Sequence, residues 1–417
     1  MKVHFLGIGG SGASAAATIA QAQGFEVTGC DLNPHNEFTT QFKKEQLLTG
    51  HNPIHLHGID ILVITPAITS LDPNNPELLA AKKILTWQEF TGQYLMKDKF
   101  IIAVTGTHGK TTTTAMTSKI LEDGGLDPTV ILGAILDGKN YRLGKSKYFI
   151  VEADEYNDNF LSYKSNIAVV TNIEMDHPEY FQDLEHYKES FKKFLLQTKD
   201  TIVANISDPG VAGVLKDLMK ESGIKCLDYS KNELELKLQI PGEFNIQNAN
   251  AAFQVGLLLD IDPEIIKKSL SSYKGVGRRF EYLGDFRGAK IYTDFGHHPT
   301  EIKTTMAAAR EKFPDQKIWL VYEPHMFTRT YKLFDDFVKV FKDLDIDKII
   351  ITDIYQSREK DLGLVSSKQL ADAVNKENVS YVSKTDLDDY LEKLEENDVV
   401  FFMGAGDIDK IARSFVS

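Results

Sequence analysis

The chain has 417 residues, of which 42% are hydrophobic and 26% are charged, so we expect a globular protein with about two to four hydrophobic cores. Its 47 basic and 60 acidic side chains give a formal net charge of −13, which disfavours binding to a nucleic-acid backbone. Because no apolar stretch reaches the ~18 residues of a membrane helix and the N-terminus lacks a signal-peptide pattern, we expect a cytoplasmic protein without membrane insertion.

The first part of the chain alternates short apolar runs with helix-forming stretches. An apolar run at residues 3–8 leads through a glycine-rich turn into an alanine-rich stretch at 13–23 that is typical of a helix. Further strands are expected at 26–30, 59–64 and 84–85. Because strands that alternate with helices form parallel sheets, residues 1–98 are predicted to form a first α/β domain, which ends at a polar break.

A second alternating segment covers residues 99–281. Its first strand, 100–104, enters another glycine-rich turn and is followed by a predicted helix at 111–123. The remaining expected elements are a polar helix at 186–198 and strands at 148–152, 167–171 and 201–204. This pattern predicts a central domain built on a mostly parallel sheet.

The pattern starts again in residues 282–417. Strands are expected at 290–293, 317–322, 348–352 and 399–402, with a helix at 300–312. The charge-rich stretch 386–398 is predicted to be the solvated face of a helix. The fold class is therefore α/β with three domains, the first and last of them Rossmann-like.

Two glycine-rich turns stand between a strand and a helix. The run Gly7-Ile8-Gly9-Gly10-Ser11-Gly12 fits G-x-G-x-x-G, and Asp31 ends the next strand. Such a turn brings backbone N–H groups to a pyrophosphate at a helix N-terminus, and a carboxylate at this position accepts hydrogen bonds from a sugar or a base. A dinucleotide and a nucleotide-sugar diphosphate fit this pattern equally well.

The second turn, Gly106-Thr107-His108-Gly109-Lys110-Thr111, ends in the Gly-Lys-Thr of a phosphate loop. It is a shortened variant, since Val104 stands where the first glycine of the motif is usual. Lys110 is placed to bridge the β- and γ-phosphates, and the Thr111 hydroxyl to bind Mg²⁺. The turn predicts ATP binding.

Polar residues follow two later strands of the central domain. Glu152 ends one strand and suits Mg²⁺, which prefers hard oxygen ligands. The run Asn172-Ile173-Glu174-Met175-Asp176-His177 follows the next strand and reaches the same sheet edge. Taken alone, His177 is more often a structural or exposed histidine than a metal ligand.

The two cysteines and the three histidines at 51, 55 and 57 form no recognisable metal-binding or catalytic motif. Cys30 and Cys226 match no metal or redox spacing, which suits a reducing compartment, and we expect both to be small buried residues. His51, His55 and His57 are expected to be surface or structural residues.

With these motifs in order, the whole chain resembles the Mur ligases. The resemblance rests on the first glycine-rich turn and on a series of later runs: residues 105–114 (TGTHGKTTTT), 152–155 (EADE), 171–177 (TNIEMDH), 244–249 (FNIQNA), 277–281 (GRRFE), 294–301 (DFGHHPTE), 324–330 (PHMFTRT) and 404–408 (GAGDI). By this resemblance the first domain binds a UDP-linked substrate, the central domain binds ATP, and the last domain closes over the site with an amino acid.

The resemblance also implies roles for single residues. Those implied to bind the UDP group are Gly9, Gly10, Ser11, Gly12, Asp31 and Thr65. Those implied to bind ATP are Gly106, Thr107, His108, Gly109, Lys110, Thr111, Thr112, Asn248, Arg279 and Asp294. The implied Mg²⁺ ligands are Thr111, Glu152 and His177, and the implied catalytic residues are Lys110, His297, His325 and Arg329. Of His297 and His298, one is expected to cap the following helix, and His297 is the functional candidate.

The implied reaction is the ATP-dependent joining of an amino acid, expected to be L-alanine, to the carboxylate of UDP-N-acetylmuramate. It passes through an acyl phosphate, releases ADP and phosphate, and belongs to peptidoglycan precursor synthesis. A monomer or weak homodimer is expected. The alternative within the family is a ligase that adds a different amino acid or a preformed peptide to a related UDP-sugar.

Three positions depart from the usual pattern of the alanine-adding members. Phe295 replaces Tyr, Met326 replaces Arg, and Phe244 replaces His. The change at Met326 bears on the choice of amino acid, because Met has no guanidinium to pair with a carboxylate. Outside this reaction class, the first glycine-rich turn taken alone also fits an NAD-dependent oxidoreductase, and a non-catalytic nucleotide-binding member of the family is a third alternative.

Overall fold

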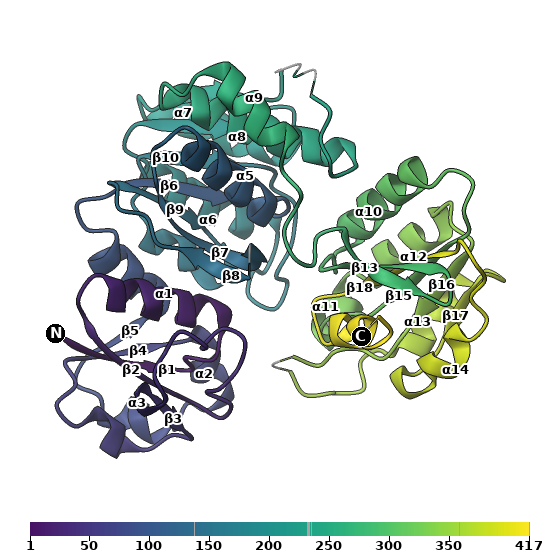
Figure 1. The fold of residues 1–417 in the computed structure, drawn as a ribbon, viewed down its shortest axis with the longest axis horizontal. Coiled ribbons are helices and arrows are strands. Elements are labelled where there is room, and N and C mark those ends of the chain that lie inside the picture. The colour runs from purple at the N-terminus through teal and green to yellow at the C-terminus, as the bar shows by residue number, and fades with distance from the viewer. Residues whose placement is uncertain (137, 232–233, 235, 358, 417) are drawn as a thin grey trace. The chain divides into compact units, whose positions relative to one another are not determined.

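The computed structural model describes residues 1–416 except 137, 232–233, 235 and 358. The described residues form three sheets, of five, seven and six strands (Figure 1). None of the helices in these residues is long and apolar enough to cross a lipid bilayer. The expected α/β fold with three sheets is therefore confirmed.

The N-terminal sheet is parallel, with the strand order β3-β2-β1-β4-β5. Its strands are β1 (Lys2–Leu6), β2 (Glu26–Asp31), β3 (Leu47–Thr49), β4 (Ile61–Ile64) and β5 (Ile84–Thr86). The helical segments are α1 (Ser11–Ala22), η1 (Lys44–Gln46), η2 (Pro53–Leu56), α2 (Pro66–Leu71), α3 (Pro76–Ala80), α4 (Trp87–Phe90) and η3 (Thr91–Leu95). The strand order reverses between β1 and β4, which creates a topological switch point at the carboxyl end of β1.

The central sheet has the order β12-β11-β10-β6-β9-β7-β8, and in its described part only β7 and β8 pair antiparallel. Its strands are β6 (Phe100–Thr105), β7 (Thr129–Leu136), β8 (Lys139–Arg142), β9 (Tyr148–Glu152), β10 (Ile167–Val170), β11 (Thr201–Ala204) and β12 (Lys225–Asp228). The helical segments are α5 (Lys110–Asp123), η4 (Tyr156–Ser162), α6 (Leu184–Leu196), α7 (Pro209–Glu221), α8 (Glu243–Leu258) and α9 (Pro263–Ser271). Here β6 lies at the switch point, between β10 and β9.

The C-terminal sheet has the order β13-β14-β18-β15-β16-β17, and an antiparallel hairpin joins β13 to β14. Its strands are β13 (Glu281–Phe286), β14 (Ala289–Asp294), β15 (Ile318–Tyr322), β16 (Lys348–Ile351), β17 (Val379–Tyr381) and β18 (Val399–Met403). The helical segments are α10 (Pro299–Lys312), α11 (Phe327–Lys332), α12 (Phe334–Asp343), α13 (Ser367–Val374), η5 (Lys384–Asp386), α14 (Leu387–Leu391) and α15 (Ile408–Ser414).

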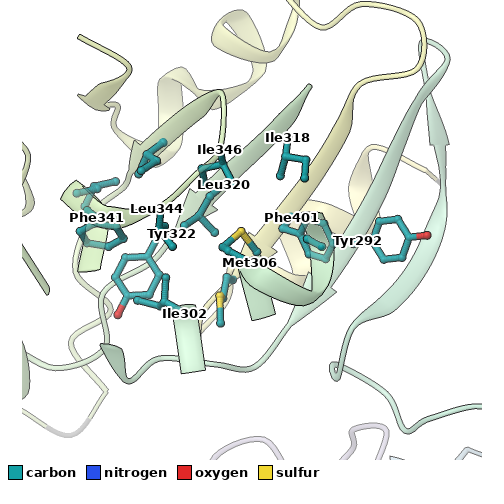
Figure 2. Packing of buried hydrophobic residues seen from close by; sticks show 14 of the residues in the cluster. Tyr292, Ile302, Met306, Ile318, Leu320, Tyr322, Phe341, Leu344, Ile346 and Phe401 are labelled. Carbon is teal, nitrogen blue, oxygen red and sulfur yellow. The ribbon is translucent and has the colours of Figure 1, made fainter. Parts of the chain in front are cut away.

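Strand β15 shows why the C-terminal sheet is covered on both faces. Ile318, Leu320 and Tyr322 point to one face and pack with residues of α10 and α12, as Figure 2 shows for Ile302, Met306 and Phe341. The alternate residues Trp319 and Val321 belong to a second core on the opposite face, with residues of α14 and α15. A strand that is apolar at every position is the pattern of a parallel sheet between two helical layers.

Contacts along the chain divide it into two compact units. The first contains residues 1–174, 184–236 and 247–271, and the second contains 175–183, 237–246 and 272–417. The segment 175–183 follows β10 in sequence yet packs with the C-terminal unit. The Lys332 ammonium, for example, donates to the Pro178 carbonyl at 2.8 Å.

All strands and helices expected from the sequence are present, except for the helix proposed at 386–398. The helix there, α14, ends at Leu391. Leu387, Leu391 and Leu394 are buried in the second C-terminal core. Their spacing places them on one face of the turn, so the charged residues between them cover only its other side.

Candidate active site

The glycine-rich turn after β1 is held by β2. The Gly7 amide donates to the Cys30 carbonyl at 2.8 Å, and a Cβ at Gly7 would lie 2.5 Å from Thr65 Cγ2. The Asp31 carboxylate accepts from the Gly9 amide at 3.0 Å. Asp31, expected from the sequence to contact a sugar or base, therefore also fixes the conformation of the turn.

Other residues expected to contact the UDP group gather at the same edge. Gly10 precedes α1 and Ser11 begins it. Gly12 packs so closely on the Trp87 indole that a Cβ would overlap the ring. Thr65 follows β4, the parallel neighbour of β1. The arrangement is a helix N-terminus at a switch point, which suits a pyrophosphate.

The phosphate loop occupies the equivalent position in the central sheet, between β6 and α5. Gly106 and Gly109 have φ angles of +130° and +82°, which favour glycine. A Cβ at Gly109 would overlap the Asn248 side chain, and one at Gly106 would overlap the Thr171 hydroxyl. Substitution at either glycine is therefore disfavoured both by backbone conformation and by the space around the added Cβ.

Residues after β10 clasp this loop. The Thr107 amide donates to the Asn172 carbonyl at 3.0 Å, and the His108 amide donates to Asn172 Oδ1 at 2.9 Å. The Thr107 hydroxyl donates to the Glu174 carbonyl at 3.0 Å, and the His108 ring contacts the Glu174 carboxylate. The amide of His108 is thus used to fix the loop.

Lys110 lies inside the loop and is paired with a carboxylate. Its ammonium donates to the Gly106 carbonyl at 2.6 Å and to the Glu155 carboxylate at 2.8 and 3.0 Å. Glu155 is fully buried and also accepts from the Tyr187 hydroxyl at 2.9 Å. Burial by itself lowers the pKa of Lys110, but the carboxylates of Glu155 and Asp154 raise it above its usual value. Lys110 therefore keeps its positive charge.

Two oxygen donors expected to bind Mg²⁺ are in contact. The Thr111 hydroxyl donates to Glu152 Oε1 at 2.8 Å, and the second Glu152 oxygen accepts from the Gly133 amide at 2.7 Å. A hydroxyl and a carboxylate are hard ligands, and Mg²⁺ takes one or two such groups from a protein when phosphate oxygens and water supply the rest. This donor pair fits the ion.

Thr112 lies in the first turn of α5, and Asn248, on α8, contacts the same turn. Asn248 Oδ1 accepts from the Thr113 hydroxyl at 3.2 Å, and the side chain packs on Gly109. Thr112 is buried in the helix. Asn248 therefore contacts the phosphate loop itself, and its expected contact with adenine stays a prediction.

In the C-terminal unit the most buried cation is Arg329. Its side chain is 2% exposed, and Nη2 and Nε lie 2.9 and 3.1 Å from Asp176 Oδ1. Burial alone would raise the pKa of Asp176, but Arg329 holds it well below its usual range. The pair joins α11 to the segment after β10.

His177 lies beside this ion pair. Its Nδ1 is 3.3 Å from both Glu179 Oε1 and Arg329 Nη2, and its φ angle of +52° is uncommon for a histidine. Burial raises the pKa of Glu179, but the hydrogen bond and charge of His177 lower it to about 2. His177 is therefore held by a carboxylate on its own segment, and its role as a metal ligand stays a prediction.

The two adjacent histidines before α10 have different environments. His298 is the N-cap residue, with Nδ1 accepting from the Thr300 amide at 3.3 Å, and Glu301 completes the capping box. The expectation that one histidine caps the helix is thus confirmed. Burial and the nearby Arg329 lower the pKa of His297 to about 4. His297 is therefore neutral near pH 7.

Arg279 and Asp294 lie at the start of the C-terminal domain. The Asp294 carboxylate accepts from the amides of Phe280 and Gly296 at 2.8 and 2.7 Å. The Arg279 guanidinium stacks on the Phe295 ring, 5.1 Å from its centroid. The aromatic ring at 295 therefore carries a cation–π contact that requires no hydroxyl.

His325 and Met326 stand between β15 and α11. The His325 ring stacks on Tyr355, with centroids 5.6 Å apart, and lies 5.5 Å from the His297 ring. Met326 is 1% exposed and has a φ angle of +68°. The Met326 side chain is thus buried in the C-terminal unit.

Three family models match the chain in order. They are the Mur ligase family catalytic domain over residues 2–89, the Mur ligase middle domain over 104–235, and the Mur ligase glutamate ligase domain over 278–406. The UDP-N-acetylmuramate–L-alanine ligase of Acetivibrio thermocellus is 39% identical, and the match covers 99% of this chain and 95% of that protein. The chain belongs to the Mur ligase family.

Other comparisons agree with this assignment. The Clostridium acetobutylicum protein of the same name is 38% identical, with 100% of this chain and 97% of that protein covered. The crystal structure of a UDP-N-acetylmuramate-alanine ligase from Thermotoga maritima superposes with a TM-score of 0.81 at 28% identity, covering 100% of this chain and 98% of that one. A murein peptide ligase from Psychrobacter arcticus, 22% identical over 100% of this chain and 98% of that one, shares the fold with a TM-score of 0.72.

Sequence reasoning missed two buried carboxylates of this Mur ligase. Glu155 belongs to the EADE run at 152–155, but no role was predicted for it, and its contact with Lys110 was not foreseen. Glu323, at the end of β15, pairs with the Lys384 ammonium at 2.6 Å and accepts from the Gly406 amide at 2.8 Å. Burial and a hydrogen bond with Asp407 raise the pKa of Glu323 to about 7. The available signal was a carboxylate shortly after a buried strand, one residue after β15 for Glu323 and three residues after β9 for Glu155.

Proposed function

We propose that this Mur ligase joins L-alanine to the carboxylate of UDP-N-acetylmuramate, with cleavage of ATP to ADP and phosphate, as a step of peptidoglycan precursor synthesis in the cytoplasm. The observation that carries the proposal is the full-length similarity to proteins named for this reaction, at 38–39% identity for the two compared above. The two phosphate-binding turns support it, because the reaction needs one triphosphate and one UDP-linked acceptor.

The first chemical step follows from the phosphate loop. The muramyl carboxylate attacks the γ-phosphorus, and the bond to the β–γ bridging oxygen breaks to give an acyl phosphate and ADP. Lys110 supplies a fixed positive charge to the phosphoryl oxygens, and the loop amides orient the triphosphate. Because Glu155 already holds Lys110, the phosphate does not have to order this side chain.

Thr111 and Glu152 would hold Mg²⁺ in this scheme. The ion, when bound, neutralises charge on the phosphate oxygens. The residues of the chain position it from one side, through the hydroxyl that begins α5 and the carboxylate that ends β9. His177 is proposed as a ligand of a second Mg²⁺ ion.

The second step forms the amide. The amine of the amino acid attacks the acyl carbonyl, and phosphate leaves from the tetrahedral oxyanion as the amine loses a proton. Arg329 supplies a buried positive charge in the C-terminal unit. His297, which is neutral near pH 7, is a candidate to accept the proton, and His325 lies next to it. Closure of the site excludes water, which would hydrolyse the acyl phosphate.

The test is incubation of the protein with UDP-N-acetylmuramate, ATP and Mg²⁺ in the presence of single amino acids. We expect phosphate release with L-alanine and a product mass that corresponds to the alanyl adduct. Release with another amine but not with alanine would overturn the amino-acid assignment. ATP binding without any release would favour the non-catalytic alternative, and tight NADH binding in place of ATP turnover would favour an oxidoreductase. Size-exclusion chromatography tests the expected monomer or weak homodimer.

One observation favours a second candidate, a ligase for a different amino acid or a peptide. Met326, next to His325 in the chain, is buried and has no group that pairs with a carboxylate. A peptide arm in the same assay distinguishes this candidate. Faster phosphate release with a peptide than with alanine would replace the first proposal.

A further inference from the structure

A cluster of four potential metal ligands lies in the N-terminal domain. None of the four is among the residues expected to contact UDP or ATP. It consists of His4 on β1, Cys30 on β2, His55 on η2 and Glu77 on α3. One ligand atom of each lies within 4.8 Å of those of the other three. No residue spacing in the sequence indicates this cluster, because the four residues come from four separate elements.

The distances resemble the edges of a tetrahedral site. Cys30 Sγ lies 3.2 and 3.3 Å from the two Glu77 oxygens, and His55 Nδ1 lies 2.9 Å from Glu77 Oε1. His4 Nε2 is 3.5 Å from Glu77 Oε2. With Zn–S, Zn–N and Zn–O bonds of about 2.0–2.3 Å, tetrahedral ligand atoms lie roughly 3.3–3.6 Å apart. The printed distances, from 2.9 to 3.5 Å, are close to these edges.

An independent observation is the state of His4. Its side chain is fully buried, and Nε2 makes no hydrogen bond although it faces the Glu77 carboxylate. The other ring nitrogen, Nδ1, is 2.8 Å from the Thr28 hydroxyl. When Nδ1 donates its proton there, the lone pair of Nε2 points at a carboxylate oxygen, an arrangement that a cation between them would stabilise.

The surroundings strengthen the affinity of such a set for Zn²⁺. Cys30 packs with Leu6, Leu62 and Ile64 in an apolar cluster, so water does not compete for the ligands. The Cys30 thiol donates to the Glu77 carboxylate at 3.2 Å, and a bound metal would take the place of this proton. A thiolate, two imidazoles and a carboxylate are the ligand types that zinc takes.

We propose that His4, Cys30, His55 and Glu77 bind a structural Zn²⁺ ion that ties β1 and β2 to the η2–α3 segment. The ion would brace the glycine-rich turn, because the Cys30 carbonyl accepts from the Gly7 amide and the next residue, Asp31, accepts from the Gly9 amide. The proposal does not depend on the reaction that the protein catalyses.

The first test measures metal in the full-length protein. After removal of metal with a chelator and reconstitution with Zn²⁺ alone, followed by dialysis, we expect one zinc per chain by elemental mass spectrometry. Reconstitution with Co²⁺ should give the visible bands of tetrahedral cobalt and a thiolate-to-cobalt charge-transfer band in the near ultraviolet. Zinc that dialyses away, or a cobalt spectrum without the thiolate band, would contradict the proposal.

Variants with matched controls identify the ligands. Cys30→Ser should lose the thiolate band, whereas Cys226→Ser, which removes the other cysteine, should keep it. His55→Asn should weaken zinc binding at least tenfold, whereas His57→Asn, two residues along and exposed, should not. Equal loss in a variant and its control would overturn the assignment. Should Cys30→Ser not fold, His55→Asn and the cobalt spectrum of the unmodified protein still decide the question.

Discussion

At the residue scale, the two cations proposed to act on the reacting groups are each held by a buried carboxylate. Glu155 pairs with Lys110 and Asp176 pairs with Arg329, and both carboxylates are at least nine-tenths buried. An unpaired buried charge costs several kcal/mol, so each pair keeps its cation charged and oriented before substrate arrives. Removal of either cation leaves its carboxylate buried without this counter-ion, so folding has to be measured alongside activity in such a variant.

Lys110→Ala tests this for the first step. We expect ligation to fall by roughly 100- to 1,000-fold or more, because the variant lacks the charge that stabilises the phosphoryl oxygens in the transition state. Binding of UDP-N-acetylmuramate, measured by calorimetry, should stay nearly unchanged. Lys119→Ala, on the same helix but partly exposed and paired with Asp123, is the control. Normal turnover in Lys110→Ala would refute the site assignment.

His297 gives a pH-dependent contribution to stability. Its pKa is lowered from 6.5 to about 4 in the folded protein by burial and by Arg329. The unfolded chain therefore binds the proton first as pH falls, and the stability that neutral His297 contributes is present above pH 6.5 and is lost between 6.5 and about 4.

His297→Gln removes this pH-dependent contribution to stability. The free energy of unfolding of the wild type minus that of the variant should fall by up to about 3 kcal/mol between pH 7 and pH 4, at roughly 1.4 kcal/mol per pKa unit. Urea denaturation at a series of pH values measures it. The exposed His57→Gln is the control. A constant difference across this range would show that burial does not shift the His297 titration.

At the scale of elements, most buried central strands were predictable, whereas most edge strands, with β5 as an exception, were not. The apolar runs of β6, β10 and β15 are long enough to signal a strand by themselves. By contrast β3, β8 and β17 are edge strands of three or four residues, with sequences such as LLT and KNYR, and their pairing depends on a neighbour. Local sequence does not encode that neighbour.

The same limit applies to the site. Glu152, which ends β9, and Lys110, which follows β6 through a glycine-rich turn, could be placed at one sheet edge because parallel strands place their carboxyl ends there. The contact of Cys30 with Glu77 joins positions 47 residues apart, and the contact of Arg329 with Asp176 joins positions 153 apart. Such contacts follow from the packing of whole elements, and no characteristic residue spacing in the sequence reveals them.

The turn between β6 and α5 gives a prediction for an element. Gly109→Ala places a side chain where φ is +82° and where a Cβ would overlap Asn248. We expect the ATP KM to rise at least roughly tenfold, because the loop amides must shift to relieve the overlap.

Gly125→Ala is a matched control, since Gly125 has a φ of +77° but open space around the added Cβ. It should lose about 1 kcal/mol of stability through backbone strain and keep the ATP KM. Equal effects on KM in the two variants would show that the overlap with Asn248 has no influence on nucleotide binding.

At the scale of the whole molecule, the chain forms two compact units with different ligands expected in each. The first unit contains both phosphate-binding turns, and the second contains the Asp176–Arg329 ion pair. If the units unfold separately, calorimetry should resolve two transitions.

UDP-N-acetylmuramate at about 100 times its Kd should stabilise the first unit by about 2.7 kcal/mol. Asp176→Asn should destabilise the second by about 3–5 kcal/mol, because it leaves Arg329 buried without its counter-ion. Each perturbation should move one transition and leave the other in place, since a ligand stabilises only the unit that binds it. A single transition that responds to both would show that the units unfold as one cooperative body.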